Sequence, residues 1–211
     1  MNIIVSGGGT GGHIYPALTI IRAIQQREPS ARILYVGTPH GLEADIVPRE
    51  GIDFIPIDLA GFQRKISLEN ISRAWRALLA VARARGIVHG FQPDVAIGTG
   101  GYVAGPILLA ASLAGVPTLV QEQNVFAGVT NRILAKFATA IAVGMEDAKN
   151  VFPKEKTYVT GNPIRPEVLT ATREEGARAF GFDPAKKTVL VSGGSRGARS
   201  INRAMVEVIA H

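Results

Sequence analysis

The sequence predicts an α/β fold, with a parallel β-sheet that carries helices on both of its faces. Short apolar runs alternate with stretches of helical composition along the chain, which is the pattern of a parallel sheet with helical crossovers. These runs are apolar at successive positions, as in strands buried on both faces. Because such sheets bind ligands outside the carboxyl ends of their strands, the segments that follow the strands are the candidate functional loops.

Strands and helices are expected in alternation. The strands are predicted at residues 2–6, 32–36, 53–57, 95–98, 118–121, 140–143, 157–160 and 188–192. The helices are predicted at residues 14–27, 43–50, 68–89, 103–114, 129–137 and 198–210. The uncharged stretch 103–120 has about the length that spans a bilayer. However, Gly105-Pro106 and Gly115-Val116-Pro117 interrupt it, which favours a helix followed by a buried strand.

A glycine-rich segment, Gly7-Gly8-Gly9-Thr10-Gly11-Gly12-His13, directly follows the first predicted strand and precedes a helix. Glycines let the backbone approach an anion closely, and the free N–H groups at the start of a helix point toward it. The segment ends in a histidine, a side chain that exchanges a proton readily near neutral pH. This combination favours nucleotide chemistry.

The segment nevertheless matches two familiar nucleotide-binding motifs only in part. Gly7, Gly9 and Gly12 satisfy G-x-G-x-x-G, but a dinucleotide site also needs an acidic residue at the end of the second strand. That strand leads into Gly37-Thr38-Pro39-His40, which contains no carboxylate. Gly7 and Gly12 also have P-loop spacing, but His13-Ile14 stands where Lys-Ser/Thr is required.

The amino-acid composition limits the classes of molecule that the protein is expected to bind. A net charge of +6 favours an anionic partner. Nucleic acid is not expected, because aromatic residues make up only 6% of the chain and no basic run is interleaved with them. Nucleotide diphosphates and anionic membrane surfaces remain. The absence of cysteine excludes disulfides and thiolate metal sites.

Three further polar or glycine-rich segments follow predicted strands: Thr99-Gly100-Gly101-Tyr102, Glu122-Gln123-Asn124 and Gly161-Asn162-Pro163-Ile164-Arg165. Since the carboxyl ends of parallel strands share one edge of a sheet, all four segments are expected to converge on one cleft.

The chain is expected to hold one complete domain and the opening of another. Residues 1–163 form the predicted complete domain, and residues 164–187 read as a linker with a short helix. Residues 188–211 repeat the opening plan of strand, glycine loop and helix. One such unit cannot enclose a core of its own. The sequence is therefore expected to be the first part of a two-domain protein.

Five ordered motifs resemble the MurG family of peptidoglycan N-acetylglucosaminyltransferases. They are the first glycine segment, Gly98-Thr99-Gly100-Gly101-Tyr102, Gln121-Glu122-Gln123-Asn124, Thr160-Gly161-Asn162-Pro163-Ile164-Arg165 and Gly193-Gly194-Ser195-Arg196-Gly197-Ala198. The resemblance implies the GT-B arrangement, in which two Rossmann-like domains face each other across a cleft. This chain would supply the acceptor-binding domain and the opening of the domain that binds UDP-GlcNAc.

The resemblance implies inverting transfer of GlcNAc from UDP-GlcNAc to the 4-hydroxyl of undecaprenyl-diphosphate-linked muramyl pentapeptide. It implies no obligatory metal and no cofactor. It also implies a peripheral location at the cytoplasmic face of the cell membrane, with an anionic membrane surface as a partner. Such a reaction needs a base for the acceptor oxygen and N–H-rich surroundings for the departing diphosphate.

Site residues follow from the matched motifs. The catalytic candidates are His13 and Glu122; alternatively, His13 orders the loop or binds acceptor phosphate, and Glu122 makes structural hydrogen bonds. The resemblance implies UDP-GlcNAc contacts at Thr10, Gly11, Gly12, Asn124, Arg165 and Ser195. It places His13, Gly100, Gly101 and Tyr102 on the acceptor side.

Relatives hold uracil, ribose and the GlcNAc hydroxyls with a later segment, so this chain alone is expected to show little or no turnover. The alternatives are another GT-B glycosyltransferase, a binding-only module and a dinucleotide-dependent oxidoreductase.

The predicted helix 68–89 offers a membrane-facing hypothesis. Projection at 100° per residue places an apolar stripe on one side, formed by Leu68, Ile71, Trp75, Leu78, Leu79 and Ala82. Basic residues lie opposite or nearby, namely Arg64, Lys65, Arg73, Arg76 and Arg83, with Lys136 elsewhere. The stripe packs either on the core or on an anionic bilayer.

Overall fold

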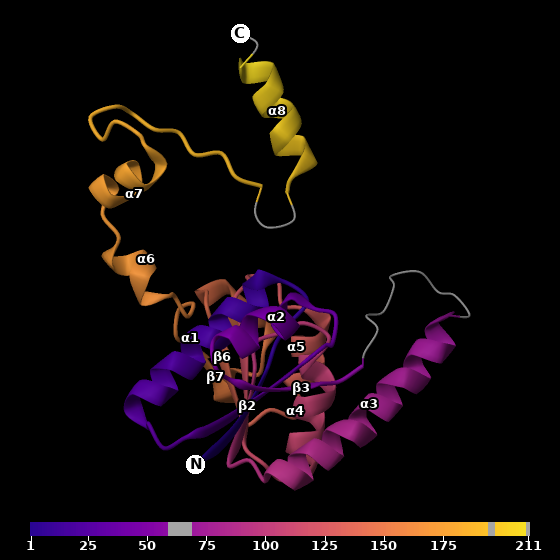
Figure 1. Ribbon diagram of the computed structural model, residues 1–211. Helices are drawn as coiled ribbons and strands as arrows, with labels where there is room; N and C mark the ends of the chain where they lie inside the picture. The colour runs from indigo at the N-terminus through magenta and orange to yellow at the C-terminus, as the bar shows by residue number, and fades with distance from the viewer. Residues whose placement is uncertain (59–68, 194–196, 210–211) are drawn as a thin grey trace. The chain divides into compact units, whose positions relative to one another are not determined.

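The fold is built on a seven-stranded, entirely parallel sheet in the order β3-β2-β1-β4-β5-β6-β7 (Figure 1). The computed structural model describes residues 1–58, 69–193 and 197–209, with the backbone alone described at 69–78. The strands are β1 Asn2–Ser6, β2 Arg32–Gly37, β3 Asp53–Pro56, β4 Val95–Gly98, β5 Thr118–Glu122, β6 Ala140–Val143 and β7 Thr157–Val159. This confirms the predicted α/β class.

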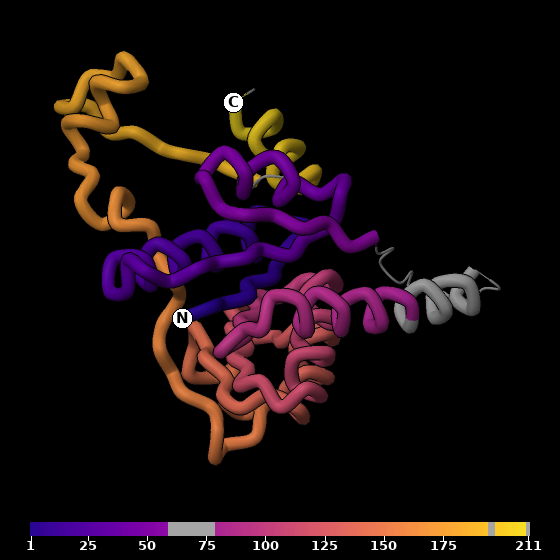
Figure 2. The backbone as a smooth tube through the Cα atoms, turned by 60° about the horizontal axis from the view of Figure 1, so that its bottom comes forward, coloured from indigo at the N-terminus to yellow at the C-terminus, as the bar shows by residue number. Residues whose placement is uncertain are grey.

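Helices cover both faces of the sheet, as Figure 2 shows for α1 and α2 on one side and α3 and α4 on the other. The α-helices are α1 Gly11–Arg27, α2 Leu42–Arg49, α3 Glu69–Phe91, α4 Ala104–Leu113, α5 Val129–Leu134, α6 Pro166–Thr170, α7 Arg173–Phe180 and α8 Arg199–Ile209. Two short 3₁₀ helices, Glu146–Val151 and Lys154–Lys156, precede β7.

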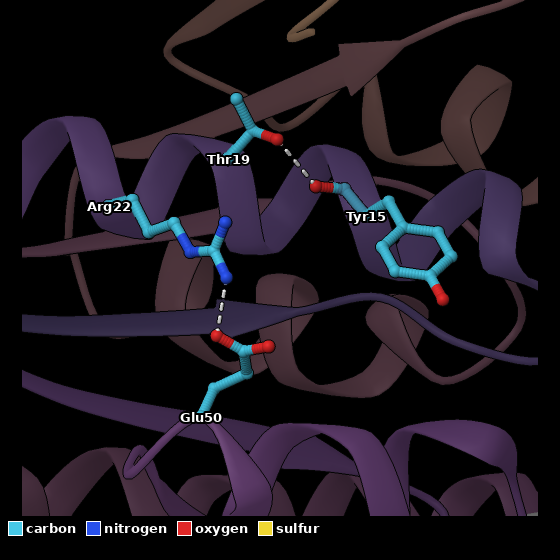
Figure 3. A network of polar contacts seen from close by, with 4 residues as sticks. All are labelled: Tyr15, Thr19, Arg22 and Glu50. Atoms are coloured by element: carbon cyan, nitrogen blue, oxygen red, sulfur yellow. Dashed lines mark hydrogen bonds and ion pairs between the residues drawn. The ribbon is translucent and has the colours of Figure 1, made fainter. Parts of the chain in front are cut away.

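Alternate residues of each strand feed two separate cores. On one face Ile3 and Val5 pack with Ile14 and Ile21 of α1 and Val47 of α2. On the other face, residues of β1, β4 and β5 pack with α3, α4 and α5 through Ile4, Ala96, Val120, Ala84, Ile107 and Leu134. Burial on both faces explains why the strands are apolar at successive positions. On the surface, Arg22 of α1 is joined to Glu50 after α2 at 2.6 Å (Figure 3).

Several element boundaries differ from the prediction. Helix α1 begins at Gly11 rather than at residue 14, and α5 ends at Leu134, beyond which the chain turns. The predicted linker contains two helices, α6 and α7, instead of one. The stretch 103–120 forms α4 and the start of β5, as expected, and none of the helices in the described ranges is long and apolar enough to cross a bilayer.

The predicted strand at residues 188–192 is wrong, because this segment has no strand structure. Val189 and Leu190 are 85% and 87% exposed. A strand forms only where a neighbour accepts its backbone hydrogen bonds, and no strand pairs with this segment in the described part of the chain.

The chain divides into two compact units, Met1–Pro163 and Ile164–His211. The first contains the whole sheet and both cores. In the second, none of the described residues is buried.

Candidate active site

The candidate site lies where the strand order changes direction, between β1 and β4. Both neighbours of this position are parallel strands whose connections run to opposite faces, which opens a crevice at their carboxyl ends. The loops after β1, β4, β5 and β7 meet here. Gly8 N–H donates to the Gly100 carbonyl at 3.3 Å, Gln123 Nε2 to the Thr99 carbonyl at 2.7 Å, and Asn162 Nδ2 to the Gln123 carbonyl at 3.2 Å. Successive loops are thus in contact along one edge of the sheet, as predicted.

Most glycines of the first loop and its neighbour are needed for packing. A Cβ at Gly7 would lie 2.0 Å from Thr99 Oγ1, and one at Gly8 would lie 2.4 Å from a carboxylate oxygen of Glu43. At Gly101 a Cβ would lie 2.4 Å from the Gly8 carbonyl oxygen, and φ is +81°. Gly9, with φ of +83°, adopts a backbone conformation that other residues rarely accept.

Gly11 and Gly12 have a different status. They form the first turn of α1, where N–H groups have no intrahelical acceptor, and these two amides find none elsewhere in the described part of the chain. A Cβ at Gly12 would meet only Thr10 Oγ1, at 3.6 Å. The packing of the fold therefore does not require glycine at position 12. Close approach of an anion to the two amides would require it.

The contacts of His13 fix its neutral tautomer. Its Nδ1 lies 3.0 Å from the Gly8 carbonyl oxygen and 3.4 Å from Thr10 Oγ1. A carbonyl oxygen only accepts hydrogen bonds, so Nδ1 carries the proton and Nε2 keeps its lone pair. The Nε2 edge lies against Gly100, where a Cβ would be 3.0 Å from Nε2 and φ is +104°. In this tautomer the Nε2 lone pair lies on the Gly100 side of the ring.

Glu122 is buried and its carboxylate is fully engaged. Oε1 accepts from the backbone and side-chain N–H groups of Asn124, both at 3.0 Å. Oε2 accepts from Gly128 N at 3.1 Å and Asn131 Nδ2 at 2.9 Å. These four hydrogen bonds hold the loop between β5 and α5, which favours the structural alternative for Glu122 over the role of base.

A second buried carboxylate, Glu43, lies behind the first glycine loop. Its oxygens accept from the Thr38 amide at 3.1 Å, the Thr38 hydroxyl at 2.7 Å and the Gly9 amide at 3.2 Å. Beside it, the Tyr35 hydroxyl donates to the Gly7 carbonyl at 2.5 Å. Burial, and then the charge of Glu43, raise the pKa of Tyr35 well above its usual value. Sequence reasoning missed Glu43, because no periodicity distinguishes it from the neighbouring Asp45.

A hollow of about 290 Å³ lies beside the same loop. Its lining includes Gly9, Thr38, His40, Asp58 and Tyr102. Tyr102 is 39% exposed, and its ring lies 3.7 Å from the point where a Cβ of Gly9 would be. The structure therefore brings the predicted acceptor-side residues Gly100, Gly101, Tyr102 and His13 together around one loop.

The structure does not place two of the predicted contacts relative to this cluster. Arg165 belongs to the second unit, where it is the N-cap residue of α6. Ser195 lies outside the described residues, although Gly193 and Gly197 on either side are described.

Residues 3–143 match the model of the glycosyltransferase family 28 N-terminal domain. The chain belongs to this family. It is 50% identical over 210 residues to the UDP-N-acetylglucosamine–N-acetylmuramyl-(pentapeptide) pyrophosphoryl-undecaprenol N-acetylglucosamine transferase of Halalkalibacterium halodurans, covering 100% of this chain and 58% of the relative. It is 54% identical to the protein of the same name from Desulforamulus reducens, covering 99% of this chain and 56% of the relative. The chain thus spans less than two thirds of these relatives.

Solved structures agree with this assignment. Acinetobacter baumannii MurG superimposes with a TM-score of 0.65 at 31% identity, covering 80% of this chain and 47% of that one. UDP-GlcNAc 2-epimerase from Neisseria meningitidis has a TM-score of 0.55 at 19% identity, covering 77% and 46%. The epimerase shares the fold alone.

Proposed function

We propose that this chain supplies the acceptor-binding part of an inverting transferase that moves GlcNAc from UDP-GlcNAc to the 4-hydroxyl of undecaprenyl-diphosphate-linked muramyl pentapeptide. The names of its relatives support the donor and acceptor. The observation that carries the mechanism is the bond between His13 Nδ1 and the Gly8 carbonyl, because in the neutral ring it places the proton on Nδ1 and leaves the lone pair on Nε2.

In this mechanism Nε2 of His13 takes the proton of the acceptor 4-hydroxyl as that oxygen bonds to the anomeric carbon of GlcNAc. The bond from this carbon to the diphosphate oxygen breaks, and UDP leaves with the electron pair. In the proposal, the amides of Gly11 and Gly12, together with Thr10, bind the diphosphate of UDP-GlcNAc. Glu122 binds the side chain of Asn124 at 3.0 Å, and Asn124, Arg165 and Ser195 are the other donor contacts in this proposal.

Two rival functions make different demands. A dinucleotide-dependent oxidoreductase needs a free carboxylate after β2 to hold a ribose, and the carboxylate nearest that position, Glu43, is buried and bound to Thr38 and Gly9. A binding-only module would use the same amides but would not depend on the tautomer of His13.

A membrane surface is part of the proposal. Four apolar side chains around α5 are exposed: Phe126 in the loop before it, Val129 and Ile133 within it, and Phe137 in the turn after it, with exposed fractions of 90%, 72%, 54% and 46%. Arg132 of α5 and Lys136 in the turn after it are exposed as well. Of the stripe predicted on α3, Leu79 and Ala82 are exposed; Leu68, Ile71, Trp75 and Leu78 and the cations Arg64, Lys65, Arg73 and Arg76 lie outside the described side chains.

Titration separates the candidate functions. We expect this chain to bind a water-soluble analogue of the lipid-linked acceptor and UDP-GlcNAc, and not NADH. The chain alone should give little turnover beside the Halalkalibacterium halodurans relative. Equal turnover by the two would contradict this expectation, and binding of NADH alone would support the oxidoreductase.

The role of His13 is tested in a chimera that joins this chain to the remaining C-terminal part of that relative. His13→Asn keeps a side-chain N–H for the Gly8 carbonyl but removes the base, so kcat should fall about 10²–10⁴-fold with little change in KM. The matched control is His89→Asn, on the exposed end of α3. An unchanged kcat in His13→Asn would refute the base assignment.

Membrane contact is tested by co-sedimentation with vesicles that contain phosphatidylglycerol. Arg132→Ala with Lys136→Ala should lower the bound fraction, as should removal of Arg64, Lys65, Arg73 and Arg76, while the exposed control Lys154→Ala should not. Binding unaffected by both sets of changes would count against the membrane partner.

A further inference from the structure

Glu43 and His13 are connected through one peptide group, the one between Gly8 and Gly9. Its N–H donates to Glu43 Oε2 at 3.2 Å, and its C=O accepts from His13 Nδ1 at 3.0 Å. The N–H and C=O of a trans peptide point in opposite directions from one plane. The carboxylate and the imidazole therefore lie on opposite sides of the same polarisable unit.

We infer that Glu43 is a positioning residue that holds His13 in its Nδ1-protonated tautomer through this peptide. A carboxylate bound to the N–H pulls positive charge toward itself and makes the carbonyl at the other end a stronger acceptor, since hydrogen bonds in a chain polarise one another. The stronger acceptor holds the proton on Nδ1 and leaves the lone pair on Nε2. The inference rests on the proposed function only for the use made of that lone pair.

The surroundings of Glu43 are built around its carboxylate. Thr38 supplies two donors to Oε1, so Oε2 is left for Gly9. Three glycines make room: a Cβ would lie 2.4 Å from Oε1 at Gly8, 2.3 Å from both oxygens at Gly41, and 2.6 Å from Cγ at Gly37. Glycines at positions 8, 37 and 41 are thus explained by the buried acid.

Other charged or titratable groups act on His13 less directly. His13 belongs to the first turn of α1, in which no acidic residue occurs. Glu122 binds Asn131, whose Nδ2 lies 3.5 Å from the point where a Cβ of Gly100 would be. Tyr102 faces Gly9. Among the described residues, no carboxylate bonds to the His13 ring directly, so the Gly8–Gly9 peptide is the connection.

The test is the tautomer of His13, read from the ring ¹⁵N chemical shifts of the chain labelled at histidine, at alkaline pH where the imidazole is neutral. His13→Gln assigns the signals among the four histidines. The wild-type ring should be protonated mainly on Nδ1. Glu43→Gln keeps the volume, and with its oxygen on the two Thr38 donors it turns an NH₂ group toward Gly9. We expect the Nδ1-protonated fraction to fall about twofold or more.

The control is Glu50→Gln, which makes the same change to a carboxylate that binds Arg22 away from the loop (Figure 3); its tautomer should match wild type. A folded Glu43→Gln with an unchanged tautomer would overturn the inference. If this variant does not fold, hydrogen exchange in the wild-type chain decides, because the Gly9 amide should be protected, and exchange at the rate of unstructured glycine would overturn the inference. Neither measurement needs turnover, so the inference and the proposed function can fail separately.

Discussion

At the scale of single residues, the glycines of the glycine-rich segments have different structural roles. Gly8 makes room for Glu43, and Gly101 makes room for the Gly8 carbonyl. Gly12 has no steric reason to be glycine, and its amide finds no acceptor within the described residues. The glycine-rich motif is therefore part scaffold and part candidate anion site, a division that the spacing of the glycines does not reveal.

This division predicts opposite outcomes for two alanine substitutions. Gly8→Ala drives a Cβ into the Glu43 carboxylate and should lower the free energy of unfolding by about 1–3 kcal/mol. Gly12→Ala should leave the free energy of unfolding within about 1 kcal/mol, because alanine is a better helix residue. Its affinity for UDP-GlcNAc should fall about tenfold, or ~1.4 kcal/mol, as the methyl group blocks the amides. Urea unfolding and calorimetric titration measure the two effects; a Gly12→Ala chain with unchanged affinity would remove the anion site from the first turn.

Tyr35 should make stability depend on pH at the alkaline end. Its folded-state pKa is raised by burial and by Glu43, so the folded chain holds the phenol proton more tightly than the unfolded chain. The hydroxyl's contribution, about 1 kcal/mol from its bond to Gly7, is complete below the unfolded tyrosine pKa of ~10 and declines as pH rises above it. The difference in free energy of unfolding between wild type and Tyr35→Phe should shrink from pH 9 to pH 11. A difference that grows over this range would contradict the assignment.

At the scale of elements, strands were more predictable from sequence than helix ends. A buried parallel strand is a short apolar run, and the predicted runs at residues 2–6, 95–98 and 140–143 coincide with β1, β4 and β6. Helix α1 begins three residues earlier than predicted. The prediction left out Gly11 and Gly12 because glycine is a poor helix former. In the structure the preceding loop is held by a tertiary contact, from Gly8 N–H to the Gly100 carbonyl. Local composition does not encode that contact.

The loop between β5 and α5 illustrates how a buried charge organises an element. Glu122→Gln would replace one acceptor oxygen by an NH₂ group, so in either orientation two of the four donors lose their partner. We expect a loss of about 2–5 kcal/mol in the free energy of unfolding, measured with urea. Glu146→Gln, at a side chain that is 75% exposed, is the matched control and should cost less than about 0.5 kcal/mol. A Glu122→Gln chain as stable as this control would show that the carboxylate does not hold the loop.

At the scale of the whole molecule, alternation of strands and helices was enough to predict the parallel sheet and the edge at which the loops meet. It was not enough for residues 188–192, whose sequence resembles β1 but which have no neighbouring strand in the described part of the chain. A strand forms only when a neighbouring strand pairs with it, and the apolar pattern of one segment carries no information about its neighbour. Glu43 was hidden for a similar reason, since one of its donors, the Gly9 amide, comes from a distant part of the chain.

The distribution of burial predicts that the first unit folds by itself. Both cores lie within Met1–Pro163, and no described residue of Ile164–His211 is buried. A chain that ends at Pro163 should therefore unfold cooperatively in urea, with a free energy of unfolding within about 0.5 kcal/mol of the 211-residue chain. In limited proteolysis of the longer chain, the first cuts should fall after residue 163, because exposed segments without a core open most easily. If the shorter chain lost cooperative unfolding, the second unit would be contributing to the stability of the first, and the cores on the two faces of the sheet would be insufficient to fold it.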